Sequence, residues 1–148
     1  MNKYIFLLVA IILIVIGWYF LSPLFIDDKV NENLPIDSNS PEIFEEISSA
    51  NFQDADSYHK TSGEVKTVQS ENKKYLRFEN FEATNGPDLK VYLSKDLQAS
   101  EFISLGDLKG NIGNQNYELP ADFNQDDYPY VLIWCEQFSV LFGSAQLS

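Results

Sequence analysis

The sequence has very few of the side chains that disulfides, zinc sites and haem sites require. Its 148 residues include one cysteine, Cys135, one histidine, His59, and one methionine, Met1. One cysteine excludes an intramolecular disulfide, and one Cys with one His is too few for a structural zinc site. The C-x-x-C-H motif of covalent c-type haem is absent, and Met1 lies too far upstream to ligate a haem in a C-terminal domain.

The motifs of common hydrolase and nucleotide sites are also absent. There is no G-x-S-x-G, so any Ser/His or Cys/His mechanism depends on His59. The segment "GDLKGNIGNQ" (106–115) has neither a Walker lysine and threonine nor a following helix pattern. The acidic loop "DFNQDD" (122–127) begins like a calcium loop, but Asp127 occupies the glycine position and Ile133 the bidentate glutamate position. We therefore expect a solvated loop there and no metal site.

Positive charge is scarce. The chain has 10 Lys and Arg against 22 Asp and Glu, a net charge of −12. One of these lysines, Lys3, precedes residue 27, so the remaining nine cations leave residues 27–148 with a net charge of −13. Nucleic acids and anionic lipid headgroups are poor partners for such a chain, because both are bound by cationic patches.

The longest hydrophobic run lies close to the N-terminus. Residues 4–21, "YIFLLVAIILIVIGWYFL", contain no charge and are long enough to cross a bilayer as a helix. A secretory signal usually has a shorter apolar core and a small-x-small cleavage site, whereas this run ends in aromatic residues that suit a membrane interface. We expect residues 1–26 to be an uncleaved signal anchor, with a cleaved signal peptide as the alternative.

The charges around this run predict its orientation. Lys3 precedes it and Asp27 and Asp28 follow it, so the positive-inside rule places the N-terminus in the cytoplasm. The expected protein is single-pass in the cell membrane, held through residues 4–21, with residues 27–148 extracytoplasmic.

Residues 27–50 read as an acidic tether. The composition of residues 22–40 is typical of a flexible coil, which would lift the following domain roughly 20 to 30 Å off the membrane. Within "SPEIFEEISSAN" (40–51), Ser40 is a candidate N-cap, Pro41 suits the first helical position, and three apolar residues share one helical face. The segment therefore predicts a short helix.

From residue 51 onward the pattern indicates β structure. Apolar and polar residues alternate in 63–70, 74–83 and, most clearly, 89–93, and residues 130–147 predict one or two further strands. Short strands at this spacing favour an all-β domain over residues 51–148, an antiparallel β-sandwich or flattened barrel behind the single N-terminal helix.

Cys135 lies in the last of these strand patterns. Alternation places it with Val131 and Ile133 on one face, and Trp134 and Glu136 on the other. Apolar burial and an acidic neighbour both favour the protonated thiol, which is a slow nucleophile. The residues alone favour a buried core cysteine, with a soft ligand or redox thiol as the alternative.

His59 lies in the polar segment "DSYHKTSGE" (56–64) and reads as a surface or loop histidine. The functional alternative is that it approaches Cys135 as a ligand, proton acceptor or hydrogen-bond partner.

Four segments together resemble the DM-thirteen family, also called the electron-transfer DM domain. They are "FQDADSYHKTSGEV", "YLRFENFEATNGPDLKVYLS", "FISLGDLKGNIGNQNYELP" and "VLIWCEQFSVLFGSAQL", and the resemblance covers about residues 52–147. Members of that family are small, mostly β, extracytoplasmic domains, some of which stand alone behind a membrane anchor. The resemblance implies a redox role centred on the cysteine of a Trp-Cys motif, here Trp134-Cys135.

By this resemblance Cys135 works directly as a redox thiol or holds a prosthetic group such as haem, with Trp134 and His59 shaping the site. A redox protein is then the expected partner. The alternative is a non-catalytic surface binding or adhesion module. In it Cys135 is structural, and the turns at 85–87 and 110–116 contact a glycan or protein.

Overall fold

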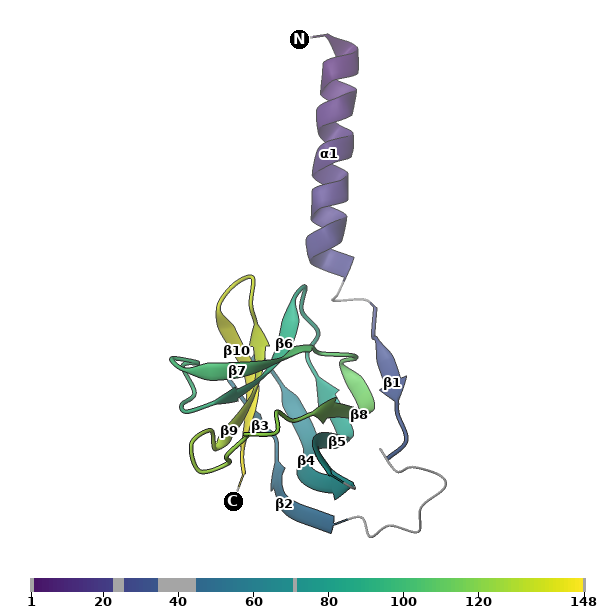
Figure 1. Ribbon diagram of the computed structural model, residues 1–148. Coiled ribbons are helices and arrows are strands. Elements are labelled where there is room, and N and C mark those ends of the chain that lie inside the picture. Colours follow the sequence, from purple (N-terminus) through teal and green to yellow (C-terminus); the bar gives the residue numbers. More distant parts are fainter. Residues whose placement is uncertain (1, 23–25, 35–44, 71, 148) are drawn as a thin grey trace.

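The computed structural model describes residues 2–22, 26–34, 45–70 and 72–147, which form one helix followed by ten strands (Figure 1). The elements are α1 (Lys3–Leu21), β1 (Lys29–Asn31), β2 (Glu45–Asn51), β3 (Gln53–Asp54), β4 (Thr61–Ser70), β5 (Lys73–Ala83), β6 (Leu89–Ser94), β7 (Phe102–Asp107), β8 (Ile112–Glu118), β9 (Tyr130–Cys135) and β10 (Val140–Gln146).

The strands form two five-stranded sheets that enclose one core. The first sheet has the order β1-β8-β5-β4-β2 and the second β3-β10-β9-β6-β7. Every pairing is antiparallel except that of β1 with β8, which is parallel. The described strands close no barrel, so the predicted sandwich is confirmed, and the first sheet is mixed where the sequence predicted an antiparallel one.

Alternation of side chains builds the core, with one irregularity in β5. Asn80 has a φ of 49°, and the register of β5 against β8 shifts between Phe78 and Phe81. This bulge turns both phenylalanines inward, although they are three residues apart. Phe52 meets both rings edge-on, at centroid distances of 4.9 and 5.1 Å.

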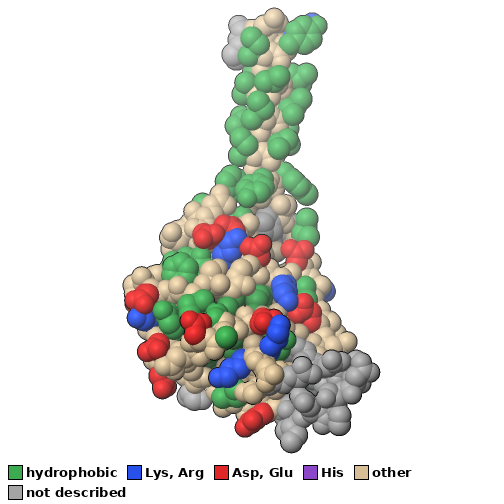
Figure 2. Space-filling view, in the orientation of Figure 1, with side chains coloured by type: hydrophobic (Ala, Val, Ile, Leu, Met, Phe, Trp, Pro, Cys, Tyr) green, Lys and Arg blue, Asp and Glu red, His purple; other side chains and the backbone are tan. Residues whose placement is uncertain are grey.

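Helix α1 stands apart from this core. None of its described side chains is buried, and its length and composition are sufficient to cross a membrane, as they are in some signal sequences. Apart from Lys3, its surface is hydrophobic, whereas acidic and basic side chains are scattered over the domain below it (Figure 2). The predicted apolar helix is present.

The chain after α1 is fastened to the domain. Strand β1 pairs with β8, and the Glu32 carboxylate accepts hydrogen bonds from Lys109 Nζ (2.8 Å) and the Asn116 N–H (2.7 Å). Burial raises the pKa of Glu32, but these hydrogen bonds more than offset that effect, so its pKa lies below the ordinary value. Residues 26–34 are therefore not the predicted flexible coil, because strand pairing and side-chain bonds hold them.

Two glycines make room for this segment. Gly113 has a φ of 113°, and a Cβ there would overlap the Val30 carbonyl oxygen. A Cβ on Gly110 would lie 2.5 Å from the Asp28 carbonyl oxygen. The close approach of the two backbones thus depends on the missing side chains.

The helix predicted over residues 40–51 is wrong in its second half. Residues 45–51 form strand β2, which pairs with β4. Ser48 is buried and its hydroxyl donates to Gln125 (2.8 Å), so tertiary pairing overrides the local helical pattern. Residues 40–44 lie outside the described residues.

Replacing Gly113 by alanine tests the docking of β1. We expect Gly113→Ala to lower the free energy of unfolding by ~1–3 kcal/mol from backbone strain, and by about 1 kcal/mol more from lost β1 hydrogen bonds. Gly106→Ala is the matched control, because Gly106 has a φ of 96° with nothing within 4 Å of an added Cβ. Denaturation of the full chain in detergent gives both values, and hydrogen exchange reports on residues 29–31. If both variants lost the same free energy of unfolding, and hydrogen exchange at residues 29–31 were unchanged in Gly113→Ala, the close approach of the two backbones would be contradicted.

Candidate functional site

Cys135 ends strand β9 with its side chain in the core. Val131, Ile133 and Cys135 are all 0% exposed and belong to the same hydrophobic cluster. Trp134 lies on the opposite face, where its ring is near Tyr92. The predicted alternation is confirmed. Among the hydrogen bonds of the described residues, none involves the Cys135 thiol.

The turn at residues 85–88 covers this end of β9. Leu89, the first residue after the turn, is the register partner of Cys135 across the sheet. The Gly86 backbone lies against Phe142 and Leu89, because a Cβ there would be 3.0 Å from the Phe142 ring. A reagent that approaches from this end of the sandwich must therefore displace the turn or Phe142 to reach the sulfur.

His59 lies outside the core cluster, against the ring of Phe142. Its Nδ1 is 2.7 Å from Asp56 Oδ2, and its ring centroid is 4.3 Å from that of Phe142, a member of the Cys135 cluster. No hydrogen bond, ion pair or ring contact between described residues joins His59 to Cys135. The sequence prediction of a loop histidine fits this position.

Tyr92 was missed by the sequence analysis. The alternation in residues 89–93 predicted a half-buried strand with Tyr92 on the solvent side, yet Tyr92 is only 2% exposed. Its hydroxyl donates to Glu136 Oε1 (3.2 Å). Burial, and then the negative charge of Glu136, raise the pKa of Tyr92 to about 12. The proximity of Tyr92 to Glu136 follows from the β6–β9 register, which no local pattern shows.

Lys90 brings a cation to this end of the domain. Its Nζ lies 2.9 Å from Asp88, 2.5 Å from Asp107 and 3.7 Å from Glu136. Hydrogen bonds to Asp107 and Asp88 raise the pKa of the ammonium group. A pocket of about 250 Å³ lies here, lined by Lys90 and the 86–89 segment. Three carboxylates therefore surround the single Lys90 ammonium group.

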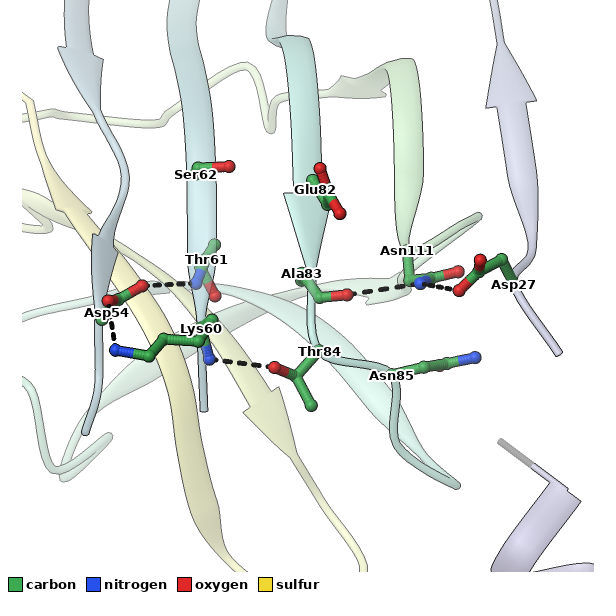
Figure 3. Close-up of a pocket in the computed structure, with 10 residues that line it drawn as sticks. All are labelled: Asp27, Asp54, Lys60, Thr61, Ser62, Glu82, Ala83, Thr84, Asn85 and Asn111. Carbon is green, nitrogen blue, oxygen red and sulfur yellow. Dashed lines mark hydrogen bonds and ion pairs between the residues drawn. The ribbon is translucent and has the colours of Figure 1, made fainter. Parts of the chain in front are cut away.

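A second pocket, of about 480 Å³, adjoins the first, because Asn85 and Asn111 line both. Figure 3 shows a row of hydrogen bonds across neighbouring strands: Asp54 accepts from the Thr61 N–H (2.8 Å), and Asn111 donates to Asp27 (3.0 Å). The lining contains three carboxylates and one ammonium group, on the residues Asp27, Asp54, Glu82 and Lys60. This pocket suits a polar ligand that is neutral or cationic.

The comparison with known families identifies the domain. A family model described as electron transfer DM13 matches residues 51–147. The chain belongs to this family. No curated protein and no solved structure matched the chain.

Parts of the segments by which the sequence resembles the electron transfer DM13 family lie close together at one end of the sandwich. Gly86 lies against Leu89 and Phe142, and both of these side chains belong to the same cluster as Cys135. The Thr61 hydroxyl donates to the Phe142 carbonyl (3.0 Å), which ties β4 to the same point. The 108–117 segment carries the two glycines against which residues 28–30 lie. These motifs thus organise a single region of the domain, next to α1 (Figure 1).

Haem does not fit this arrangement. A thiolate ligand to iron needs an open slot on the sulfur, whereas the Cys135 side chain is closed in by apolar core residues. His59, the second candidate ligand, is not brought to Cys135 by any described contact: its Nδ1 contacts Asp56 and its ring lies against Phe142. In this closed position the Cys135 sulfur has no room for a haem iron.

The contact with Asp56 gives a pH test of His59. Hydrogen bonds from the His59 ring, and then from the backbone N–H groups of His59 and Tyr58, lower the pKa of Asp56 to about 2. A lowered folded-state pKa stabilises the fold above the unfolded value of about 3.9, and this stabilisation is lost as the pH falls through 2. We expect carbon-detected NMR to place the Asp56 midpoint near 2, and His59→Ala to raise it. A midpoint that His59→Ala does not move would contradict the contact.

Burial of the Cys135 thiol predicts slow labelling. In the full chain in detergent, we expect a maleimide to react with Cys135 at least about 100-fold more slowly than in denaturant, because local opening must come first. Pro87→Gly loosens the covering turn by about 0.4–1 kcal/mol, so labelling should accelerate about two- to fivefold. Pro120→Gly, in a different loop, is the matched control and should leave the rate unchanged. Labelling of the folded chain at the denatured rate would show that the thiol is open.

Proposed function

We propose that this protein is a membrane-anchored, extracytoplasmic electron-transfer domain in which Cys135 is the redox-active thiol. The observation that carries the proposal is the position of Cys135: it is fully buried, and Leu89, its register partner across the sheet, lines a pocket. Membership of the electron transfer DM13 family supports the electron-transfer role.

The proposed membrane arrangement uses α1 as the anchor. Lys3 on one side and Asp27 and Asp28 on the other support an extracytoplasmic domain by the positive-inside rule. The domain is then held close to the membrane surface, because Asn85 Nδ2 donates to the Ile26 carbonyl (2.9 Å) shortly after the helix ends. A redox partner in or on the same membrane is within reach.

In the proposed reaction Cys135 exchanges with a disulfide of a partner protein. The turn opens, the Cys135 sulfur forms a bond to one partner sulfur, and the partner's S–S bond breaks. The departing partner sulfur takes the electron pair of that bond and the proton that Cys135 releases. Cys135 is thereby oxidised to the disulfide level and the departing sulfur is reduced to a thiol. The acidic surroundings and burial keep the resting thiol unreactive until the turn opens.

The 480 Å³ pocket favours a second candidate function, a non-catalytic binding module. Its lining offers amide, hydroxyl and carboxylate groups, from Asn85, Asn111 and Thr84 among others, of the kind that hold a polar ligand such as a glycan. In this candidate Cys135 only fills the core. The two functions make different predictions for Cys135.

Redox chemistry of the full chain separates these candidates. The chain is purified in detergent from a haem-supplied host and incubated with oxidised glutathione. We expect a colourless protein that slowly gains one glutathione at Cys135, loses it on reduction, and reacts faster as Pro87→Gly. Intact-mass spectrometry measures the adduct, and Cys135→Ser should form none.

Two results would overturn the proposal. A visible haem band that disappears in Cys135→Ser would make the residue a haem ligand, against the geometry described above. A colourless folded chain that forms no adduct, even as Pro87→Gly, and whose Cys135→Ser variant is merely less stable, would favour the binding module.

A further inference from the structure

Three aromatic rings from neighbouring strands lie together on the outer face of the second sheet. The Tyr92 ring of β6 stacks on Phe102 of β7, with centroids 4.0 Å apart and planes inclined by 15°. On its other side Trp134 of β9 lies at 6.4 Å, inclined by 28°. The three rings form an array across three strands, on the face opposite to Cys135.

Burial differs along this array. Tyr92 is 2% exposed and Phe102 is 43% exposed, while Trp134 is partly buried. The central phenol is therefore shielded from water, and the indole beside it reaches the surface. Tyrosine and tryptophan are the two aromatic side chains that lose one electron most readily, whereas phenylalanine does not react and serves here as a cover.

The Tyr92 hydroxyl has a carboxylate in place to take its proton. It donates to Glu136 Oε1 (3.2 Å), and the other oxygen of that carboxylate lies 3.7 Å from Lys90 Nζ. An oxidised tyrosine becomes strongly acidic, and a buried cation is costly, so its oxidation requires a nearby proton acceptor. The raised pKa of Tyr92, about 12, means that the phenol carries its proton at neutral pH.

We propose that Trp134 and Tyr92 form a one-electron relay, with Glu136 as the proton acceptor of Tyr92. A high-potential one-electron oxidant, such as the oxidised metal centre of a partner protein, takes an electron from Trp134 at the surface. The Trp134 radical cation then takes an electron from Tyr92, while the phenol proton passes to Glu136. The products are neutral Trp134, a Tyr92 radical, a protonated Glu136 and the reduced partner, and an electron from a reductant reverses these steps.

This relay rests on the proposed electron-transfer function but requires no chemistry at Cys135. Trp134 and Cys135 are adjacent in sequence, yet their side chains lie on opposite faces of β9. The relay therefore adds a redox site that a cysteine-centred description leaves out.

Flash oxidation of the full chain in detergent by photogenerated ruthenium(III) tris-bipyridine tests the relay. We expect electron paramagnetic resonance to show a long-lived tyrosyl radical, because burial protects Tyr92 from reactions with solvent. Tyr92→Phe should remove that signal and leave a shorter-lived tryptophan radical. Glu136→Gln should slow radical formation by about 100-fold, the low end for a lost proton acceptor, and Trp134→Phe should slow it severalfold.

Tyr58→Phe is the matched control, because Tyr58 is 83% exposed and lies outside the array. It should remove only short-lived signal, and thermal melts establish that each variant is folded. A long-lived radical that survives in Tyr92→Phe, or one whose formation is unchanged in both Trp134→Phe and Glu136→Gln, would overturn the relay. The signal should persist in Cys135→Ser, so loss of the relay and loss of the thiol reaction are measured separately.

Discussion

The candidate site depends on the pleat of strand β9, whose middle residues are buried on both faces of the sheet. Val131, Leu132 and Ile133 are all 0% exposed, whereas Trp134, near the end of the strand, is only partly buried. Successive side chains of a strand point to opposite faces, and Trp134 and Cys135 consequently enter different environments. The Trp134 ring lies near Tyr92 on the outer face of the sheet, and the Cys135 thiol lies in the hydrophobic core.

A second constraint joins the segment that follows α1 to the same region. Because Gly110 and Gly113 lack side chains, residues 28–30 lie directly on the edge of the first sheet. The segment is further fixed where Arg77 Nη1 donates to the Glu32 carbonyl (2.8 Å), with the Arg77 side chain itself almost fully buried. Residues 26–34 are therefore held against the domain by backbone pairing and side-chain bonds together. The covering turn of Cys135 is part of this connection, because Asn85 bonds the chain just after α1.

Features that depend on neighbouring residues in the sequence could be predicted, whereas features that depend on how distant strands pair could not. Alternation within residues 131–136 was sufficient to place Cys135 inside and Trp134 outside, because both depend only on strand period. The pairing of β1 with β8 was not predictable, since a three-residue strand has no period and its position depends on a missing Cβ at Gly113. The Tyr92–Glu136 hydrogen bond depends on the register between β6 and β9, which is a property of the assembled sheet. The N-cap and apolar pattern of residues 40–51 favours a helix locally, but the pairing of β2 with β4 overrides this preference in residues 45–51.

The adjacency of tryptophan and cysteine in the sequence suggests one pocket shared by both side chains, and the fold gives the opposite result. A sheet backbone lies between the indole and the thiol, and their surroundings differ in polarity and access. Glu136 and Lys90 form ion pairs around the indole side, whereas the thiol side contains apolar neighbours such as Leu89. A partner that engages Trp134 approaches the outer face of the second sheet. A partner that engages Cys135 must instead open the turn at the end of the sandwich. The two redox routes proposed for these residues are therefore separate, and a single cofactor between them is incompatible with the strand that separates them.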